Sequence, residues 1–203
     1  MQINKKTIVI ATGGTGGHIF PSVSLYEFLN SEYKIEIITD QRGLKYFQNE
    51  KSLKINIINS DRVLGKNIFK IFTGLIKTLF SIIKSFRLLI RLKPKLVVGM
   101  GGYSSFAVCL SAYALKIPII IYENNRVIGK ANRFLLPLSR KILVSTEDVE
   151  GIRNRYKHKV FQSGYLLRNK IFNIKKKKTE LYNNELSILI MGGSQSAKIF
   201  GEY

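Results

Sequence analysis

Short apolar runs alternate with longer helical patterns along the 203-residue chain. The apolar runs are rich in Ile and Val and lack polar alternation, which is typical of parallel strands buried on both faces. Strand–helix repetition of this kind predicts an α/β fold with a doubly wound parallel sheet, whose ligands bind at the carboxyl ends of the strands. The predicted strands are Thr7–Ala11, Ile35–Thr39, Lys54–Ile58, Lys95–Gly99, Pro118–Tyr122, Lys141–Ser145 and Lys159–Gln162. The predicted helices are Ile19–Asn30, Gly43–Glu50, Asn67–Leu92, Ser105–Leu115 and Ile128–Leu138.

The pattern predicts one complete domain and the beginning of a second. We expect residues 1–162 to form the first domain and residues 163–203 to hold a linker and the first strand, turn and helix of a truncated Rossmann-like domain. The run Lys175–Lys178 looks like a solvated loop, and Leu186–Met191 reads as a new strand. A strand followed by a glycine turn begins an α/β unit rather than ending a domain.

Composition limits the cellular compartments and the kinds of binding partner to be expected. The single cysteine, Cys109, lies in an apolar stretch and has no second cysteine to pair with, which fits a reducing compartment. The first apolar run is too short for a signal peptide or a membrane span, so we expect a cytoplasmic protein. The net charge of +20 predicts attraction to nucleic acid, an acidic membrane or phosphorylated substrates, unless it reflects a general bias toward Lys, Ile and Asn.

Three glycine turns follow predicted strands and open helices. They are Gly13–His18, Gly99–Ser105 and Gly192–Gln195. Glycine lets the backbone approach a ligand closely, and a helix amino terminus is a seat for phosphate. The first turn lacks the dinucleotide spacing, because Ile19 occupies the last glycine position, and it lacks the Lys of a P-loop. One such turn is compatible with a tight strand–helix connection, whereas three indicate a ligand with several phosphate or sugar oxygens.

These turns carry a family resemblance. Ala11–Pro21, Gly99–Ser105, Tyr122–Arg133 and Gly192–Ala197 are similar, in order and spacing, to segments of the MurG family. The resemblance implies a GT-B-type, inverting glycosyltransferase of peptidoglycan synthesis, a process tied to cell wall formation, cell shape and cell division. That family moves N-acetylglucosamine from UDP-GlcNAc to the muramyl C4 hydroxyl of lipid I, forming lipid II. It works as a peripheral protein on the cytoplasmic face of the inner membrane. The fragment alone is expected to be inactive.

Four segments depart from the family pattern. Tyr122–Asn125 replaces the usual His-Glu-Gln-Asn, and Ser163–Arg168 replaces Thr-Gly-Asn-Pro-Val-Arg. Ser196 stands where glycine is usual, and Gly201 where asparagine is common. Most of these changes lie toward the second domain, so they bear chiefly on donor binding.

Inverting sugar transfer needs a base for the acceptor hydroxyl. His18 ends the first glycine turn at a helix start, where the neutral form is favoured, and is the leading candidate. Its alternative roles are to cap the helix or to bond a neighbouring strand. Glu123 follows a strand and is predicted to orient His18, bind an acceptor hydroxyl, act as base itself, or accept backbone N–H bonds in its loop.

The resemblance also implies the binding residues. Those implied for UDP-GlcNAc are Thr15, Gly16, Gly17, Asn125, Arg168 and Ser194. Those implied for the acceptor and diphosphate loops are Gly13, Gly14, Gly101, Gly102, Tyr103 and Asn132, with tight-turn packing as the alternative for the last two. The only aspartates are Asp40, Asp61 and Asp148, and no Asp-x-Asp pair exists, so no metal or cofactor is expected. Helix dipoles and side-chain donors would then stabilise the leaving group.

A basic, strongly apolar helix is predicted between residues 66 and 95. Lys70, Lys77, Lys84 and Arg91 recur every seven residues within a run of Ile, Leu and Phe. Four cations disfavour a transmembrane span, whereas a basic apolar helix suits an anionic membrane surface. The alternative is a core helix with its lysines in water, and we expect a mixture of the two.

Other functions remain open beside the MurG-like one. A different GT-B lipid glycosyltransferase, such as one acting on diacylglycerol, would carry the same glycine turns. A non-catalytic module that binds membrane and acceptor is a further possibility. A nucleic-acid partner is not expected, because the cations lie beside apolar residues and no recognition motif is present.

Overall fold

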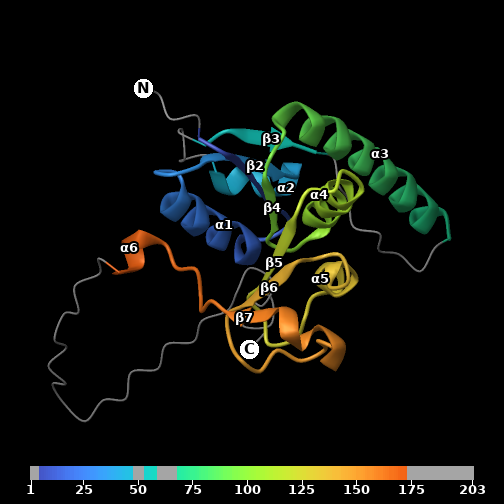
Figure 1. Ribbon diagram of the computed structural model, residues 1–203. Helices are drawn as coiled ribbons and strands as arrows, with labels where there is room; N and C mark the ends of the chain where they lie inside the picture. The colour runs from blue at the N-terminus through green and yellow to red at the C-terminus, as the bar shows by residue number, and fades with distance from the viewer. Residues whose placement is uncertain (1–4, 48–52, 59–67, 173–203) are drawn as a thin grey trace, which may run out of the picture.

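The computed structural model describes residues 5–47, 53–58 and 68–172, which form a parallel sheet covered by helices on both faces (Figure 1). The strand order is β3-β2-β1-β4-β5-β6-β7, and every pairing is parallel. All seven predicted strands are confirmed within a residue or two. Their bounds are β1 Thr7–Ala11, β2 Lys34–Thr39, β3 Ile55–Ile57, β4 Leu96–Gly99, β5 Ile119–Glu123, β6 Lys141–Val144 and β7 Val160–Gln162.

The five predicted helices are also present, with shifted ends. The predicted helix Gly43–Glu50 is observed up to Phe47 as a short α-helix and a 3-10 turn, and its last three residues lie outside the described part of the chain. The predicted helix Ile128–Leu138 shortens to six residues. The helix predicted from Ile128 begins only at Lys130, because the Ile128 N–H donates to the Glu150 carbonyl (3.0 Å), which is not a helical hydrogen bond. The helical elements are α1 Gly16–Leu29, α2 Gln41–Leu44, η1 Lys45–Phe47, α3 Ile68–Leu92, α4 Tyr103–Ala114, α5 Lys130–Leu135, η2 Asn154–Lys159 and α6 Asn169–Phe172.

The five central strands, β2, β1, β4, β5 and β6, contribute residues to two separate cores on opposite faces of the sheet. On β1, Ile8 and Ile10 join the core that includes Ile19 and Val23 of α1. Val9 and Ala11 join the opposite core, which includes residues of α3, α4 and α5. Burial on both faces explains why the strands read as continuous apolar runs.

The sheet reverses its order between β1 and β4. From β1 the chain winds outward to β2 and β3, and from β4 it winds the other way to β7. The loops that follow β1 and β4 therefore diverge to opposite faces, and a crevice opens between them at the carboxyl edge. The two glycine turns predicted to bind ligand, Gly13–His18 and Gly99–Ser105, lie at this point.

Helix α3 buries small residues and exposes large apolar ones. The side toward α4 carries small and hydroxyl residues: Gly74, Thr78, Ser81 and Ser85 are buried or half-buried, and Ser111 of α4 donates to the Ile82 carbonyl (2.9 Å). Large apolar side chains face outward, with Ile76, Leu79, Phe80 and Ile83 between 39% and 66% exposed. Within the described ranges, no helix combines the length and apolar character needed to cross a bilayer.

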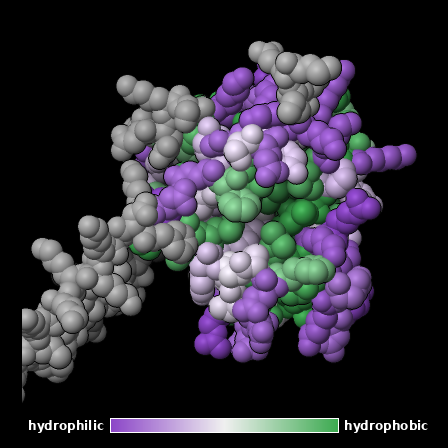
Figure 2. Space-filling view, turned by 60° about the vertical axis from the view of Figure 1, so that its left-hand side comes forward, coloured by the Kyte–Doolittle hydropathy of each residue, from purple (hydrophilic) through white to green (hydrophobic). Residues whose placement is uncertain are grey.

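After β7 the chain returns to α1. The Tyr122 hydroxyl donates to the Gly164 carbonyl (3.2 Å), and the Asn169 N–H donates to Glu27 of α1 (3.3 Å). This side, drawn on the left of Figure 1, comes forward in Figure 2, where hydrophobic surface gathers between hydrophilic side chains. The predicted second-domain strand Leu186–Met191 and its glycine turn lie outside the described residues, so that domain stays a prediction.

Candidate active site

The two glycine turns at the switch point touch each other. Gly102 has a φ of +88°, and a β-carbon there would lie 2.7 Å from the Gly13 carbonyl oxygen. A β-carbon at Gly13 would collide with the Ser104 hydroxyl, which itself donates to the Thr12 carbonyl (3.0 Å). The glycines are therefore needed for close packing of the β1–α1 and β4–α4 turns, whatever ligand they hold.

His18 lies in the first turn of α1 with its imidazole against Gly101. A β-carbon at Gly101, whose φ is +97°, would approach two imidazole atoms, Cε1 and Nδ1, to 2.8 Å. Burial lowers the pKa of His18, although the Glu123 charge and the Met100 carbonyl partly offset that effect. The Nδ1 atom is buried and has no hydrogen-bond partner among the described residues. The side chain is thus favoured in the neutral form that accepts a proton.

A cavity of ≈480 Å³ opens between His18 and the β5–α5 loop. It lies at the carboxyl edge of the sheet, and α1 and α4 both begin beside it without an acidic residue in their first turns. Two uncompensated helix amino termini favour an anionic ligand here. The cavity brings together seven predicted site residues: His18, Gly101, Gly102, Tyr103, Glu123, Asn125 and Asn132. It also includes Gly129, Lys130 and Ala131.

Glu123 organises the loop that forms one wall of this cavity. The carboxylate is 1% exposed and accepts four hydrogen bonds. Oε1 accepts from the backbone and side-chain amides of Asn125 (3.0 and 2.7 Å), and Oε2 accepts from Gly129 N–H (2.9 Å) and Asn132 Nδ2 (3.0 Å). Four donors occupy the lone pairs of the carboxylate, so the geometry favours positioning over proton transfer.

Asn132 is positioned from two sides. Its side-chain amide donates to Glu123 and to the Tyr122 carbonyl (2.9 Å), while its Oδ1 atom is buried without a partner among the described residues. An unpaired buried acceptor is costly unless a ligand donor reaches it. Asn132 is thus a fixed acceptor beside the cavity, which tight-turn packing alone does not explain.

Two residues at this site were missed by the sequence reasoning. Lys130 opens α5 and is an exposed cation on the cavity wall. Asn124 donates through its side-chain amide to the Gly17 carbonyl (2.8 Å), joining the β5–α5 loop to the first glycine turn. The signal for Asn124 was Pro21, which lies inside α1 and cannot donate the helical N–H bond that Gly17 would otherwise accept.

The remaining donor-side residues lie apart from the cavity. Arg168 stacks on Phe20 of α1, with the guanidinium carbon 4.3 Å from the ring centroid. Phe20 in turn packs beside Gly16, where a β-carbon would lie 2.9 Å from the ring. Neither Arg168 nor the residues Gly13–Gly17 line the cavity itself, and Ser194 is outside the described residues.

The structure describes three of the four α3 cations named in the membrane prediction, and it bears on the metal prediction through its acidic, histidine and cysteine side chains. Lys77, Lys84 and Arg91 are exposed on α3, and the side chain of Lys70 is not among those described. In the described part of the chain, no three His, Cys, Asp or Glu side chains gather as a metal site requires. The expectation of a metal-free reaction stays a prediction.

The sequence is similar to a glycosyltransferase family profile and to individual proteins named as glycosyltransferases. The sequence profile described as "Glycosyltransferase family 28 N-terminal domain" matches residues 8–144. A Rickettsia felis protein named UDP-N-acetylglucosamine–N-acetylmuramyl-(pentapeptide) pyrophosphoryl-undecaprenol N-acetylglucosamine transferase is 35% identical over 97% of this chain and 55% of its own length. The Rhodospirillum centenum protein of the same name is 36% identical over 96% of this chain and 52% of its length. The chain thus spans about half the length of these relatives.

Solved structures show the fold. Acinetobacter baumannii MurG superposes with a TM-score of 0.61 at 22% identity, over 73% of this chain and 43% of that one. A Neisseria meningitidis UDP-GlcNAc 2-epimerase bound to UDP-GlcNAc gives a TM-score of 0.55 at 20% identity, over 78% of this chain and 46% of that one. The described domain therefore has the predicted GT-B-type architecture.

Proposed function

The chain belongs to glycosyltransferase family 28, and we propose that it is the acceptor-side half of an inverting transferase acting on lipid I. The resemblance to the MurG family is confirmed by the names of its relatives. In the proposed reaction, N-acetylglucosamine passes from UDP-GlcNAc to the muramyl C4 hydroxyl of lipid I, and lipid II and UDP leave.

The observation that carries this proposal is the half-buried imidazole of His18, which lines the cavity together with Glu123. In the proposed step, neutral His18 takes the proton of the acceptor hydroxyl as its oxygen attacks the anomeric carbon of the donor sugar. The bond from that carbon to the diphosphate oxygen breaks, and UDP departs with the electron pair, so the configuration inverts. The amino termini of α1 and α4, together with Lys130, favour the negative charge that develops on the diphosphate.

The other proposed roles follow from position. Thr15, Gly16, Gly17 and Asn125 contribute the donor contacts of this half, while Arg168 and Ser194 belong to the donor side formed with a second domain. The turns Gly13–Gly14 and Gly101–Tyr103, with Asn132, hold the acceptor. Because a GT-B site lies between two domains, we expect residues 1–203 alone not to turn over.

A hybrid enzyme tests the proposal. Residues 1–203 would replace the matching half of the Rickettsia felis relative, and transfer of radiolabelled N-acetylglucosamine to a lipid I analogue would be measured. We expect the hybrid to be active and His18→Ala to reduce kcat by at least ~100-fold. A folded hybrid that transfers only to diacylglycerol would replace this proposal with the other lipid glycosyltransferase, and one that transfers to neither acceptor would leave a binding module.

We also propose that α3 docks the protein on the cytoplasmic face of an anionic membrane as a peripheral protein. Its outward apolar residues follow helical spacing (Ile76, Leu79, Phe80, Ile83), and Lys77, Lys84, Arg87 and Arg91 lie beside them. Small residues on the inner face let α3 pack on α4 without using these side chains. An exposed apolar stripe flanked by cations is suited to the lipid headgroup region, where each cation adds ~1 kcal/mol.

Vesicle co-sedimentation tests this docking. Binding of the 203-residue chain should rise with the fraction of phosphatidylglycerol, and Leu79→Ser with Phe80→Ser should reduce it at least ~10-fold. Phe28→Ser is the matched control, because Phe28 is 78% exposed on α1, away from this stripe. Binding that ignores either the anionic lipid or the α3 substitutions would refute the proposal.

A further inference from the structure

The opposite edge of the sheet concentrates positive charge. Each of the seven strands begins with a lysine or follows one within three residues. Since the strands are parallel, these lysines gather at the amino-terminal edge, far from the His18 cavity along the strands. The lysines are Lys6, Lys34, Lys54, Lys95, Lys116, Lys141 and Lys159.

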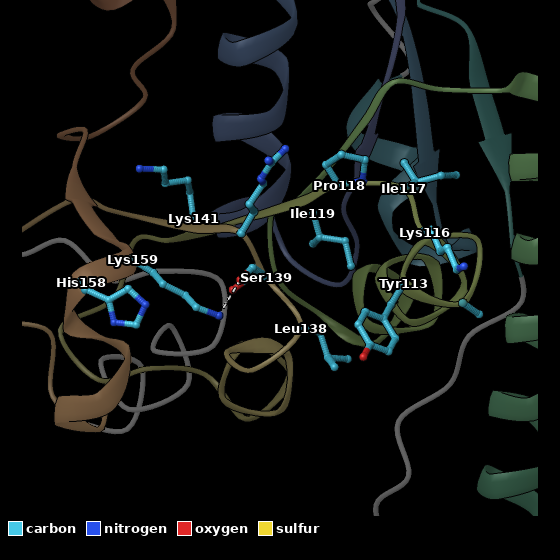
Figure 3. Close-up of a pocket in the computed structure, with 12 residues that line it drawn as sticks. Tyr113, Lys116, Ile117, Pro118, Ile119, Leu138, Ser139, Lys141, His158 and Lys159 are labelled. Carbon is cyan, nitrogen blue, oxygen red and sulfur yellow. Dashed lines mark hydrogen bonds between the residues drawn. The ribbon is translucent and has the colours of Figure 1, made fainter.

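This edge contains a cavity of ≈870 Å³ between the end of α4 and the start of β6 (Figure 3). Tyr113 and Lys116 lie on one side of it, His158 and Lys159 lie on the other, and Ile119 and Ser139 lie between. Much of the lining is apolar, from Ile117, Pro118 and Leu138. Among the described residues, no acidic side chain lines the cavity.

The cations of this cavity differ in how far they are engaged. Lys159 donates to the Leu136, Pro137 and Ser139 carbonyls (3.3, 3.3 and 2.8 Å), so its ammonium group is already engaged by the backbone of the cavity wall. Lys141 lies 3.7 Å from the Phe161 ring centroid. Lys116 and Arg140 are exposed and form no ion pair within the described part of the chain. These two cations are therefore available to an anionic partner.

The acidic residues of the described chain lie away from this cavity. Glu147, Asp148 and Glu150 follow β6 at its carboxyl end, and Glu32 and Glu36 lie at β2, which β1 and β4 separate from β5. Glu123 lies on β5 but at the opposite, carboxyl end of that strand, so no described carboxylate lies at the amino-terminal ends of β5 and β6 where the cavity opens. A cleft lined by charge of one sign attracts ligands of the other sign.

We propose that this cavity binds an acidic segment of a partner protein through a central aliphatic side chain and flanking carboxylates. The aliphatic floor suits an aliphatic anchor, while Lys116 and Arg140 suit the carboxylates. A half-exposed tyrosine and an arginine beside an apolar floor are the residue types enriched at protein interfaces. The site goes beyond the proposed transfer reaction and does not depend on it.

Two other anionic partners fit less well. A bilayer needs protruding apolar groups, as on α3, whereas this surface is hollow. Single-stranded nucleic acid needs aromatic platforms for successive bases, whereas the two aromatic side chains of this lining, Tyr113 and His158, lie on opposite sides of the cavity (Figure 3).

Fluorescence anisotropy on the 203-residue chain tests the proposal with a labelled peptide in which glutamates flank one central leucine. Lys116→Glu combined with Arg140→Glu should weaken binding by at least ~10-fold. The matched control, Lys54→Glu with Lys95→Glu, makes the same charge change at exposed positions on the same edge and should have less than a ~3-fold effect. Tyr113→Ala, at a 55% exposed position, provides a second variant that changes no charge and should also weaken binding.

Each contrary result is decisive. The proposal fails if both double variants weaken binding equally, if an all-glutamate peptide binds as well as the leucine peptide, or if no binding occurs. It is also overturned if oligothymidylate or anionic vesicles bind more tightly than the peptide and lose that binding in the Lys116→Glu, Arg140→Glu variant. Circular dichroism confirms that each compared variant is folded.

Discussion

The side-chain amide of Asn124 donates a 2.8 Å hydrogen bond to the backbone carbonyl of Gly17, which lies 107 residues earlier in the chain. Gly17 has this carbonyl free because Pro21, one helical turn later, has no N–H to donate. The bond fixes the first glycine turn against the loop that holds Glu123. This hydrogen bond therefore links the segment that carries His18 to the β5–α5 loop on the other side of the cavity.

Asn124→Ala should lower the free energy of unfolding by about 0.5–1 kcal/mol, because it removes this one partly exposed bond. Urea denaturation of the 203-residue chain measures the change. Pro21→Ala supplies a helical N–H to the Gly17 carbonyl, so the double variant should lose less than the sum of the two single effects. Strict additivity would show that Asn124 and Pro21 do not share the Gly17 carbonyl.

Gly101→Ala should displace the imidazole of His18. The new β-carbon would lie 2.8 Å from the ring, and the φ of +97° adds backbone strain. The imidazole resonances of His18 in NMR spectra should shift, and transfer by the hybrid enzyme should fall at least ~10-fold.

Gly164→Ala separates the steric effect from the strain. Gly164 has a φ of +74°, and a β-carbon added there meets nothing within 4 Å. The alanine variant therefore has backbone strain of about 1–2 kcal/mol but no steric clash. It should leave the His18 resonances in place. Equal shifts in both variants would contradict direct contact between Gly101 and His18.

The lowered pKa of His18 predicts a pH effect on stability. Because the folded-state pKa lies below the ordinary value of 6.5, the folded protein binds the proton less readily than the unfolded chain. The contribution of His18 to stability is present above pH 6.5 and is lost as the pH falls toward the folded-state pKa.

Thermal melts at graded pH measure this effect. His18→Gln should flatten the loss of stability on the acidic side of pH 6.5, whereas His158→Gln, at the only other histidine and an exposed one, should leave it unchanged. In the hybrid enzyme, the acidic limb of kcat/KM should likewise lie below pH 6.5, because kcat/KM reports the ionisations of the free enzyme. An acidic limb above that pH would argue against His18 as the base.

Glu123→Gln distinguishes positioning from proton transfer. The Gln side chain turns an N–H₂ group toward two N–H donors, which leaves donors unpaired at a site that is 1% exposed, and should cost ~1–3 kcal/mol of stability. Activity of the hybrid should fall together with Tm and remain above that of His18→Ala. A variant with unchanged Tm and no measurable kcat would instead identify Glu123 as a base.

The sequence by itself determined the local elements of this protein. The seven strands follow from continuous apolar runs, and the glycine turns follow from backbone conformations that only glycine adopts without strain, as at Gly101 and Gly102. Both are properties of short segments, so periodicity and residue type are sufficient. His18 and Glu123 were identified because parallel strands place the residues that follow them at one edge.

Only the tertiary structure decided which of these residues meet. The contact of His18 with Gly101 depends on β1 pairing with β4, and the bond from Asn124 to Gly17 depends on β5 lying next in the sheet. Helical spacing separates the small and the large apolar residues of α3 onto different faces, but only the packing of the small face against α4 leaves the apolar face outward. The cationic cavity exists because parallel strands carry Lys116 and Lys141 to the same edge. Each of these depends on long-range pairing, which the local pattern of apolar and polar residues does not encode.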